Sequence, residues 1–396
     1  MTLDIGWRDL ISGLFACMGP RSPQYESIER LWNQEFGFAH LSVRSSLDAY
    51  LATRDWPKGS EVFISAVTIP HMADIIRAWG FVPVPIDLDI ETMSPRIKQI
   101  EEHSSERTKA ILVAHLFGGF IDLDPLADLC EAHGWALIED CAQAYDGSDY
   151  RGHPKADLSL FSFGSIKSAT ALGGALSTLR SVQLKAEMST YRDQLPQLAQ
   201  SRYAFKLLKS SFIKLISLPP IYRLVWALTR RLGIDFDQLL NQSVRGFSGD
   251  DFLFKIRHQP PRALLTLLKR RVSQDRKEFY QRRGEMVKLL CDALPEKVWA
   301  LGRGSRSHSG WIIPVRVSDP SALTECLRAK GYDATHKSSS MTTIKAEEGF
   351  PEAIQASEAF RDVLYLPIYP PLGLEGYREL STVIQHYYNE REEERA

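Results

Sequence analysis

Short apolar runs alternate with amphipathic stretches between about residue 40 and residue 180. This alternation is typical of βαβ units built around a mostly parallel sheet. The predicted strands are Glu61 to Val67, Phe81 to Ile86, Ala110 to Leu116, Trp135 to Glu139, Leu158 to Phe163 and Gly174 to Leu179. The pattern therefore predicts an α/β fold.

The clearest predicted helix of this region runs from Asp124 to His133. Pro125 suits the first turn of a helix, and Leu126 and Cys130 recur on one face. Gly134 follows directly, where a glycine commonly ends a helix.

Four parts of the chain differ in pattern. An N-terminal arm (1–35) precedes a large domain (36–190), and a basic amphipathic helical insert (191–255) follows. Residues 256–396 predict a long helical stretch through Leu294 and then a small α+β domain. Its predicted strands are Gly310 to Val317 and Val363 to Pro367.

The insert carries lysine and arginine among apolar residues, with no acidic residue between Asp193 and Asp235. It is broken at Pro219 and Pro220. One interpretation is a helical hairpin that covers the core and leaves a solvated basic face. The other is contact with a membrane surface or another anionic partner through residues 200–235.

Composition narrows the class of protein. With 396 residues, 44% hydrophobic and 24% charged, the chain is typical of a globular protein. Its 48 basic and 49 acidic residues give a formal net charge of −1. Since this balance offers no general attraction for nucleic acid, no nucleic-acid partner is expected, and any contact with an anionic membrane must be local.

The five cysteines are widely spaced and form neither a disulfide scaffold nor the paired pattern of a zinc site. The N-terminus does not resemble a secretory signal, and no apolar run reaches the roughly 18 residues of a membrane span. The sequence therefore predicts a cytoplasmic protein with no metal site.

Candidate chemistry lies where predicted strands end, because ligands of open parallel sheets bind beyond the carboxyl ends of the strands. The strand at Trp135 ends in Glu139 and Asp140. An aspartate there could hold a cationic ring nitrogen by a charge-assisted hydrogen bond, or could cap the next turn.

Lys167 is the only charged residue between Asp157 and Arg180. A partly desolvated lysine in such a run favours the neutral, nucleophilic amine and Schiff-base chemistry. The alternative is a lysine that simply reaches solvent from a loop.

Ser45 and Ser46 precede a helical pattern from Leu47 to Arg54. Hydroxyl groups and backbone amides at a helix start suit a phosphate, and they suit an ordinary N-cap equally well.

Together these segments resemble the DegT/StrS family of sugar aminotransferases, which are fold-type-I enzymes using pyridoxal 5'-phosphate (PLP). The matching motifs are Ile138-Glu-Asp-Cys-Ala-Gln-Ala144, Phe161-Ser-Phe163 with Lys167 five residues after Ser162, Gly173-Gly174, Ala114-His-Leu-Phe-Gly118 and Pro85-Ile-Asp-Leu-Asp89. The resemblance implies a mostly parallel seven-stranded sheet in a large domain and a small α+β C-terminal domain.

The resemblance also implies roles for individual residues. Lys167 would bond covalently to the cofactor aldehyde and shuttle the substrate proton, and Asp140 would pair with the pyridinium nitrogen. Gln143 would lie near the ring hydroxyl. The phosphate contacts are assigned to Ser45, Ser46 and Ser162. A homodimer is expected, as in the family.

Two departures from the family pattern stand out. Arg44-Ser45-Ser46 takes the place of Ser-Gly-Thr, so an added Cβ at Ser45 is expected near the phosphate. The family's Gly-x-Asn-x-Arg segment, which reaches the neighbouring subunit's cofactor, is Leu253 to Arg257 here, with Lys255 in place of asparagine.

The leading functional hypothesis is a PLP-dependent aminotransferase that moves an amino group, expected to come from glutamate, to a keto group of a nucleotide-activated sugar. One alternative keeps PLP but takes a lipid-linked or other non-sugar acceptor at a membrane surface. Another is a non-catalytic regulator that kept the fold.

Overall fold

The computed structural model describes residues 3–216, 251–336, 341–369 and 372–393. The chain packs as two compact units, the first made of Met1–Arg54 and Leu160–Asp275 and the second of Asp55–Ser159 and Arg276–Ala396. Of the predicted basic insert, residues 217–250 lie outside the described residues. The predicted domain boundaries stay predictions.

A seven-stranded sheet has the order β1-β9-β8-β7-β5-β2-β4. Its strands are β1 (Gly37–His40), β2 (Glu61–Ser65), β4 (Val82–Ile86), β5 (Thr108–Ala114), β7 (Ala136–Asp140), β8 (Leu158–Ser162) and β9 (Ala175–Leu179). The pairs β2–β4, β2–β5 and β5–β7 are parallel, whereas β1 runs antiparallel to β9. The predicted mostly parallel sheet is confirmed.

The strands of this sheet form where apolar runs are buried on both faces. In β5, Ile111 and Val113 join one apolar core together with Phe63 of β2 and Leu137 of β7. All six predicted strands of the large domain are present, with ends shifted by at most two residues. The seventh, β1, was not predicted, because a four-residue edge strand beginning at a glycine carries little periodicity.

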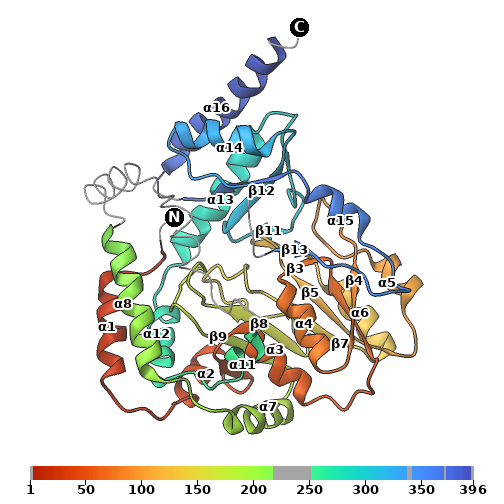
Figure 1. The fold of residues 1–396 in the computed structure, drawn as a ribbon, viewed down its shortest axis with the longest axis vertical. Coiled ribbons are helices and arrows are strands. Elements are labelled where there is room, and N and C mark those ends of the chain that lie inside the picture. The colour runs from red at the N-terminus through yellow and green to blue at the C-terminus, as the bar shows by residue number, and fades with distance from the viewer. Residues whose placement is uncertain (1–2, 217–250, 337–340, 370–371, 394–396) are drawn as a thin grey trace. The chain divides into compact units, whose positions relative to one another are not determined.

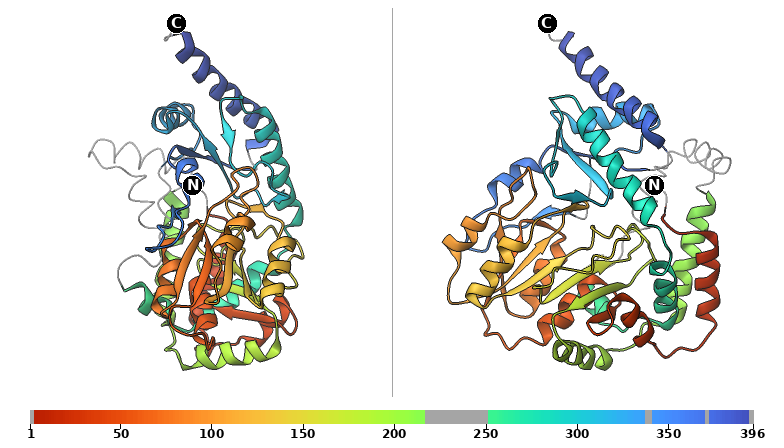
Figure 2. Two further views of the ribbon diagram at one scale, coloured as in Figure 1. Left: turned by 90° about the vertical axis from the view of Figure 1, so that its right-hand side faces the viewer. Right: turned by 180° about the vertical axis from the view of Figure 1, so that it is seen from behind.

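The described helices of the first unit are α1 (Trp7–Cys17), α2 (Glu26–Trp32), α3 (Val43–Ala52), α7 (Val182–Gln194), α8 (Gln200–Ile216), α11 (Phe252–Ile256) and α12 (Arg262–Val272). Helices α2, α3 and α7 pack against β1 of the sheet. Helices α1, α8 and α12 pack side by side (Figures 1 and 2). A Cβ at Gly13 of α1 would lie only 2.9 Å from Leu207 of α8 and 3.1 Å from Leu267 of α12, so glycine permits the close approach.

The second unit holds α4 (Pro70–Ala78), α5 (Ile97–His103), α6 (Asp124–His133), α13 (Lys277–Ala293), α14 (Pro320–Ala329), α15 (Ile354–Ala359) and α16 (Gly373–Glu393). Helix α6 has the predicted bounds. Its Pro125 lies in the first turn, and Gly134 ends it in the left-handed conformation (φ 69°).

A smaller antiparallel sheet, β10-β12-β14, lies in the same unit. Its strands are β10 (Trp299–Ala300), β12 (Ile312–Arg316) and β14 (Val363–Pro367), and two-stranded pairs join β11 (Ser307–His308) to β6 (Gly119–Phe120) and β13 (Thr342–Thr343) to β3 (Val67–Thr68). The two predicted C-terminal strands are confirmed.

The predicted long helical stretch through Leu294 consists of two helices, α12 and α13, separated by residues 273–276. Ser273 caps α12 and Arg271 is held in its last turn by buried partners. Among the described helices, none has the length and apolar character needed to cross a membrane.

Candidate functional site

The loop that carries Lys167 joins β8 to β9 in the first unit and is fixed by its own backbone. The carbonyl oxygen of Phe163 accepts from Ala171 and Gly173, and the amide of Lys167 donates to the Gly164 carbonyl at 3.0 Å. Ala169 and Leu172 adopt left-handed backbone conformations, with φ of 50° and 60°. Such conformations in residues other than glycine persist only where surrounding contacts hold them.

Contacts from α8, α12 and the segment before α1 supply that restraint. The Asp4 carboxylate accepts from the Ala169 amide at 2.8 Å, and the buried Arg271 guanidinium donates to the Thr170 carbonyl at 3.0 Å. The Tyr203 hydroxyl of α8 donates to the Ala171 carbonyl at 2.7 Å. Lys167, itself half-buried, therefore lies on a backbone that is held by two helices, α8 and α12, and by Asp4 from the segment before α1.

Ser162 and Lys167 are brought together around Gly164. A Cβ added to Gly164 would lie 3.6 Å from the Ser162 hydroxyl oxygen and 3.9 Å from Cγ of Lys167, which are ordinary contact distances. Space beside both side chains is thus available, and glycine keeps it open.

Ser45 and Ser46 lie inside the first turn of α3 rather than at its start. The helix begins at Val43, and Ser42 is the N-cap, its hydroxyl accepting from the Ser45 amide at 3.1 Å. The predicted helix start at Leu47 is wrong by four residues, because Ser42 takes the capping role that Ser45 and Ser46 also suited. An anion bound at this end of α3 would therefore contact the first turn of the helix, which begins at Val43.

The start of α3 lies next to the loop of Lys167. The Gly174 amide donates to the Leu41 carbonyl at 2.9 Å, and the Gly174 carbonyl accepts from the Phe163 amide at 3.1 Å. Gly174 has φ of +86°, a conformation that favours glycine. One glycine therefore joins the residue before the Ser42 cap to the end of β8.

The α11 segment docks on α3 of its own chain. The Ser45 hydroxyl donates to the Ile256 carbonyl at 2.7 Å. Arg257 binds the buried Asp48 carboxylate through two hydrogen bonds of 3.0 and 2.9 Å, and Tyr191 donates a third at 2.8 Å. Burial, together with the charge of Asp48, raises the pKa of Tyr191, so its hydroxyl stays a donor. The expected reach of this segment to a neighbouring subunit stays a prediction.

Asp140 and Gln143 belong to the second unit, at the carboxyl end of β7. One carboxylate oxygen of Asp140 accepts from the Ala142 amide at 2.9 Å, as predicted for a turn cap, and the side chain is 6% exposed. The Gln143 side chain accepts from the Phe117 amide at 2.6 Å, which fixes a left-handed turn after β5. Both side chains are thus positioned by their own unit.

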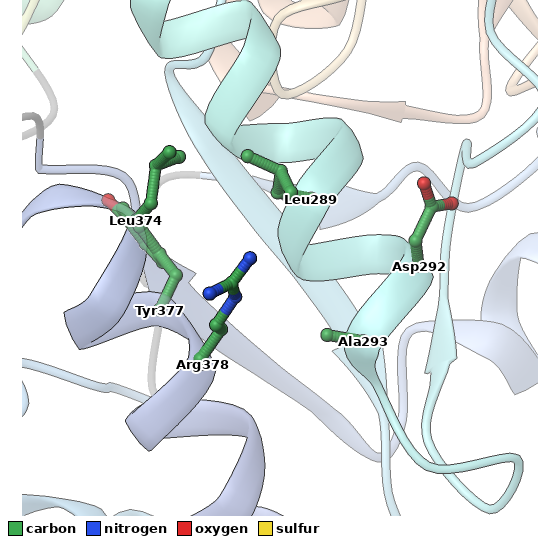
Figure 3. Close-up of a pocket in the computed structure, with 6 residues that line it drawn as sticks. All are labelled: Leu289, Asp292, Ala293, Leu374, Tyr377 and Arg378. Carbon is green, nitrogen blue, oxygen red and sulfur yellow. The ribbon is translucent and has the colours of Figure 1, made fainter.

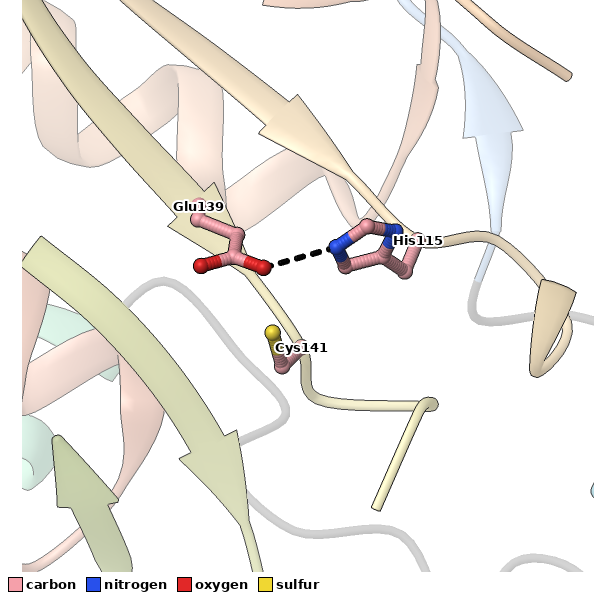
Figure 4. Close-up of side chains that lie close together, drawn as sticks. All are labelled: His115, Glu139 and Cys141. Atoms are coloured by element: carbon pink, nitrogen blue, oxygen red, sulfur yellow. Dashed lines mark hydrogen bonds and ion pairs between the residues drawn. The ribbon is translucent and has the colours of Figure 1, made fainter. Parts of the chain in front are cut away.

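A buried cluster includes the two residues on either side of Asp140 in the sequence, Glu139 and Cys141, together with His115 (Figure 4). His115, Glu139 and Cys141 place one ligand atom each within 4.8 Å of one another, a possible metal set. Both oxygens of Glu139 are already used, one by His115 and Tyr150, the other by the His153 amide and Ser159. Four hydrogen bonds fill the acceptor positions of a carboxylate, so this cluster is a hydrogen-bond network.

Protonation states in the cluster follow from these contacts. Burial by itself raises the pKa of Glu139, but hydrogen bonds from His115, Ser159 and Tyr150 outweigh it and bring the pKa to about 2. Burial raises the pKa of the Cys141 thiol well above its usual value, and the charge of Glu139 adds to that effect. Glu139 is therefore a carboxylate and Cys141 an unreactive thiol.

A small pocket of the second unit contains none of the predicted site residues. It lies between α13 and α16 and is lined by Leu289, Asp292, Ala293, Leu374, Tyr377 and Arg378 (Figure 3). It therefore adds nothing to the chemistry proposed for Lys167.

Sequence reasoning missed Ser42, Tyr203 and Arg271. The serine had a signal, since it stands three residues before Ser45 at the end of an apolar run. Tyr203 and Arg271 had none, because their partners lie 32 and 101 residues away.

A family model described as the DegT/DnrJ/EryC1/StrS aminotransferase family matches residues 8–207. The UDP-4-amino-4-deoxy-L-arabinose–oxoglutarate aminotransferase of Shewanella sediminis is 31% identical over 183 residues, 46% of this chain and 47% of that protein. An L-glutamine:2-deoxy-scyllo-inosose aminotransferase of Streptomyces kanamyceticus is 33% identical over 213 residues, 49% of each chain. The chain spans about half the length of these curated relatives.

Solved structures share the fold over nearly the whole chain. The aminotransferase TlmJ from Streptoalloteichus hindustanus has a TM-score of 0.68 at 20% identity and covers 96% of this chain and 95% of its own. NtdA from Bacillus subtilis, solved with bound cofactor PMP, has a TM-score of 0.69 at 16% identity over 96% and 82%. At these identities the likeness concerns the fold, and it confirms the expected fold type.

Proposed function

The chain belongs to the DegT/DnrJ/EryC1/StrS aminotransferase family, and from that premise we propose that it transfers an amino group with PLP as cofactor. The observation that carries the proposal is the way in which the backbone around Lys167 is held. Its loop contains two left-handed residues and is held by α8, α12 and Asp4, and Gly164 leaves space beside Lys167 and Ser162. Holding a reactive group in one place is what such a reaction requires of a protein.

The residues present fit this cofactor by the chemistry of their side chains. The lysine amine suits the aldehyde, the hydroxyl of Ser162 suits the phosphate, and the buried carboxylate of Asp140 suits a protonated ring nitrogen. The turn of α3 that holds Ser45 and Ser46 begins beside the Lys167 loop, and helix N-termini favour phosphate.

Each residue has a task in the proposed reaction. PLP, when bound, supplies an electron sink for a substrate carbon that loses its proton. Lys167 takes that proton at Nζ and returns it, a role worth roughly 10² to 10⁴ in rate. The Asp140 carboxylate keeps the ring nitrogen protonated. Gln143 would contact the cofactor near its ring hydroxyl, and its side-chain oxygen also accepts from the Phe117 amide.

The proposed substrates are a small amino donor and a keto acceptor. We propose glutamate as donor and a keto group of a nucleotide-activated sugar as acceptor. The name of the Shewanella relative gives a UDP-sugar and oxoglutarate, and that of the Streptomyces relative gives L-glutamine and an inosose. Both donors and both acceptor classes therefore belong in the assay.

The test uses the full chain and a lysine variant. Wild-type protein incubated with PLP should turn yellow, and borohydride should fix a phosphopyridoxyl group on the peptide that contains Lys167. Lys167→Ala should lose both signals, while the exposed Lys330→Ala should keep them. A colourless wild type in excess PLP, or labelling of another lysine, would contradict the proposal.

Two alternative functions can each be distinguished by an experiment. A lipid-linked acceptor is favoured by the exposed apolar side chains of α8, and would be recognised by turnover that needs lipid vesicles. A non-catalytic regulator would bind PLP without conversion to the pyridoxamine form by glutamate or glutamine. We also propose a homodimer, which light scattering of the purified protein would test.

A further inference from the structure

Helices α1 and α8 each expose a stripe of large apolar side chains. The side chains recur at three- and four-residue steps, which places them on one face of each helix. Their exposed fractions run from 39% to 74%. They are Trp7, Ile11, Phe15 and Met18 along α1, and Phe205, Leu208, Phe212 and Leu215 along α8. Apolar groups gathered in this way mark interaction sites more often than single exposed residues do.

These stripes are not needed for packing between the helices. The inward faces of α1 and α8 are filled by other side chains, including Leu10, Tyr203 and Leu207, which are buried. The two helices lie alongside each other within the first unit (Figures 1 and 2). Both stripes therefore lie outside the core, on two helices that pack against each other.

The charges around the stripes have one sign. Helix α8 carries four cationic residues and no acidic one: Arg202, Lys206, Lys209 and Lys214. The acid of α1, Asp9, is buried and paired with Arg270 and Arg271 at 2.7 and 2.8 Å. A chain of net charge −1 thus concentrates positive charge beside its exposed apolar stripes.

We propose that the α1–α8 face docks on a membrane surface rich in anionic phospholipid. Apolar side chains would enter the boundary between headgroups and acyl chains, and the lysines and arginines would meet the phosphates. The residues that follow α8 in the sequence, up to Asp235, continue the apolar and basic composition without an acid. A second copy of the chain is disfavoured as occupant, because a two-fold contact would bring the same positive face against itself.

Docking at this face bears on the Lys167 loop. Tyr203 of α8 bonds Ala171, Asp4 before α1 bonds Ala169, and Arg271 links Asp9 to Thr170. Helix α8 of the proposed face therefore bonds the loop directly, and α1 is linked to it through Asp9 and Arg271. The docking inference itself does not depend on the proposed amino transfer.

Flotation of the full-length protein with lipid vesicles tests the proposal. Wild type should float with vesicles of equal parts phosphatidylcholine and phosphatidylglycerol, stay behind with pure phosphatidylcholine, and bind less as salt rises. Phe205→Ser/Phe212→Ser and, separately, Phe15→Ser should each reduce vesicle binding, the double variant at least about tenfold. Ile354→Ser, an equally exposed residue on α15, is the matched control and should bind like wild type.

Three outcomes would overturn the proposal. They are no binding of wild type to anionic vesicles, undiminished binding of the double variant, or equal loss in the Ile354→Ser control. Light scattering separates the competing occupant: if the double variant changes from dimer to monomer while wild type ignores vesicles, the face is an interface between copies. Circular dichroism melts of all variants should match wild type, since every substituted side chain is exposed.

Discussion

Replacing Glu139 by glutamine removes one charge from the network that holds the end of β7 before Asp140. Glu139 is fully buried, and its carboxylate accepts four hydrogen bonds. Nδ1 of His115 accepts from the Ile121 amide at 3.2 Å, so the proton is on Nε2, which donates to Glu139. The substitution keeps the shape of the side chain and changes only what it can accept.

Two estimates of the loss agree. The pKa of Glu139 falls from 4.5 to about 2, and a shift of about 2.5 pH units corresponds to about 3 kcal/mol of stability above pH 4.5. In the variant, the amide oxygen still accepts from His115 and Tyr150, but the NH₂ group faces the His153 amide and the Ser159 hydroxyl. The hydroxyl can turn, whereas the backbone amide cannot. One buried donor without an acceptor costs about 1–3 kcal/mol.

Urea unfolding followed by tryptophan fluorescence measures the effect. At pH 7 we expect Glu139→Gln to lower the free energy of unfolding by about 2–3 kcal/mol, and the exposed Glu131→Gln to change it by less than about 0.5 kcal/mol. Because the folded-state pKa of Glu139 is depressed, the wild-type advantage is complete above pH 4.5 and disappears as pH falls toward 2. A variant as stable as the control, or an advantage independent of pH, would refute the network.

Three further outcomes follow from other contacts. Gly164→Ala should fold normally, since Gly164 does not have a positive φ and there is room for a Cβ. It should nevertheless bind PLP about tenfold more weakly in an absorbance titration. Unchanged affinity would mean that the cofactor does not use the space beside Ser162. Arg257→Lys should lose the two-pronged bond to Asp48 and about 1–2 kcal/mol in urea unfolding, and Asp48→Asn should not add to that loss in the double variant. Burial, with the charge of Arg283, lowers the pKa of His308 to about 4, so the unfolded chain takes up a proton that the folded chain refuses. The contribution of neutral His308 to stability should therefore be fully present above pH 6.5 and decline toward pH 4, by up to about 1.4 kcal/mol per pH unit. His308→Gln should reduce this decline, and a flat pH profile of the wild type would contradict the prediction.

The sequence alone was enough to predict the fold class and most of the strands. Buried runs such as that of β5 are apolar throughout, and α6 bears both a proline at its start and a glycine at its end, so local signals were enough. The motifs around Asp140 and Lys167 carried the family, which the match over residues 8–207 confirms. Local chemistry therefore determined what kind of protein this is.

Tertiary structure decided what surrounds those motifs. Ser42 is the N-cap of α3, and the helical stretch after residue 260 is interrupted before Lys277. The loop of Lys167 is held by side chains of Asp4, Tyr203 and Arg271. Each depends on partners distant in the chain or on competition between equally suitable neighbours. Periodicity reports which face of a segment is apolar, but only packing selects the partner, and so only packing showed that the stripes of α1 and α8 remain uncovered.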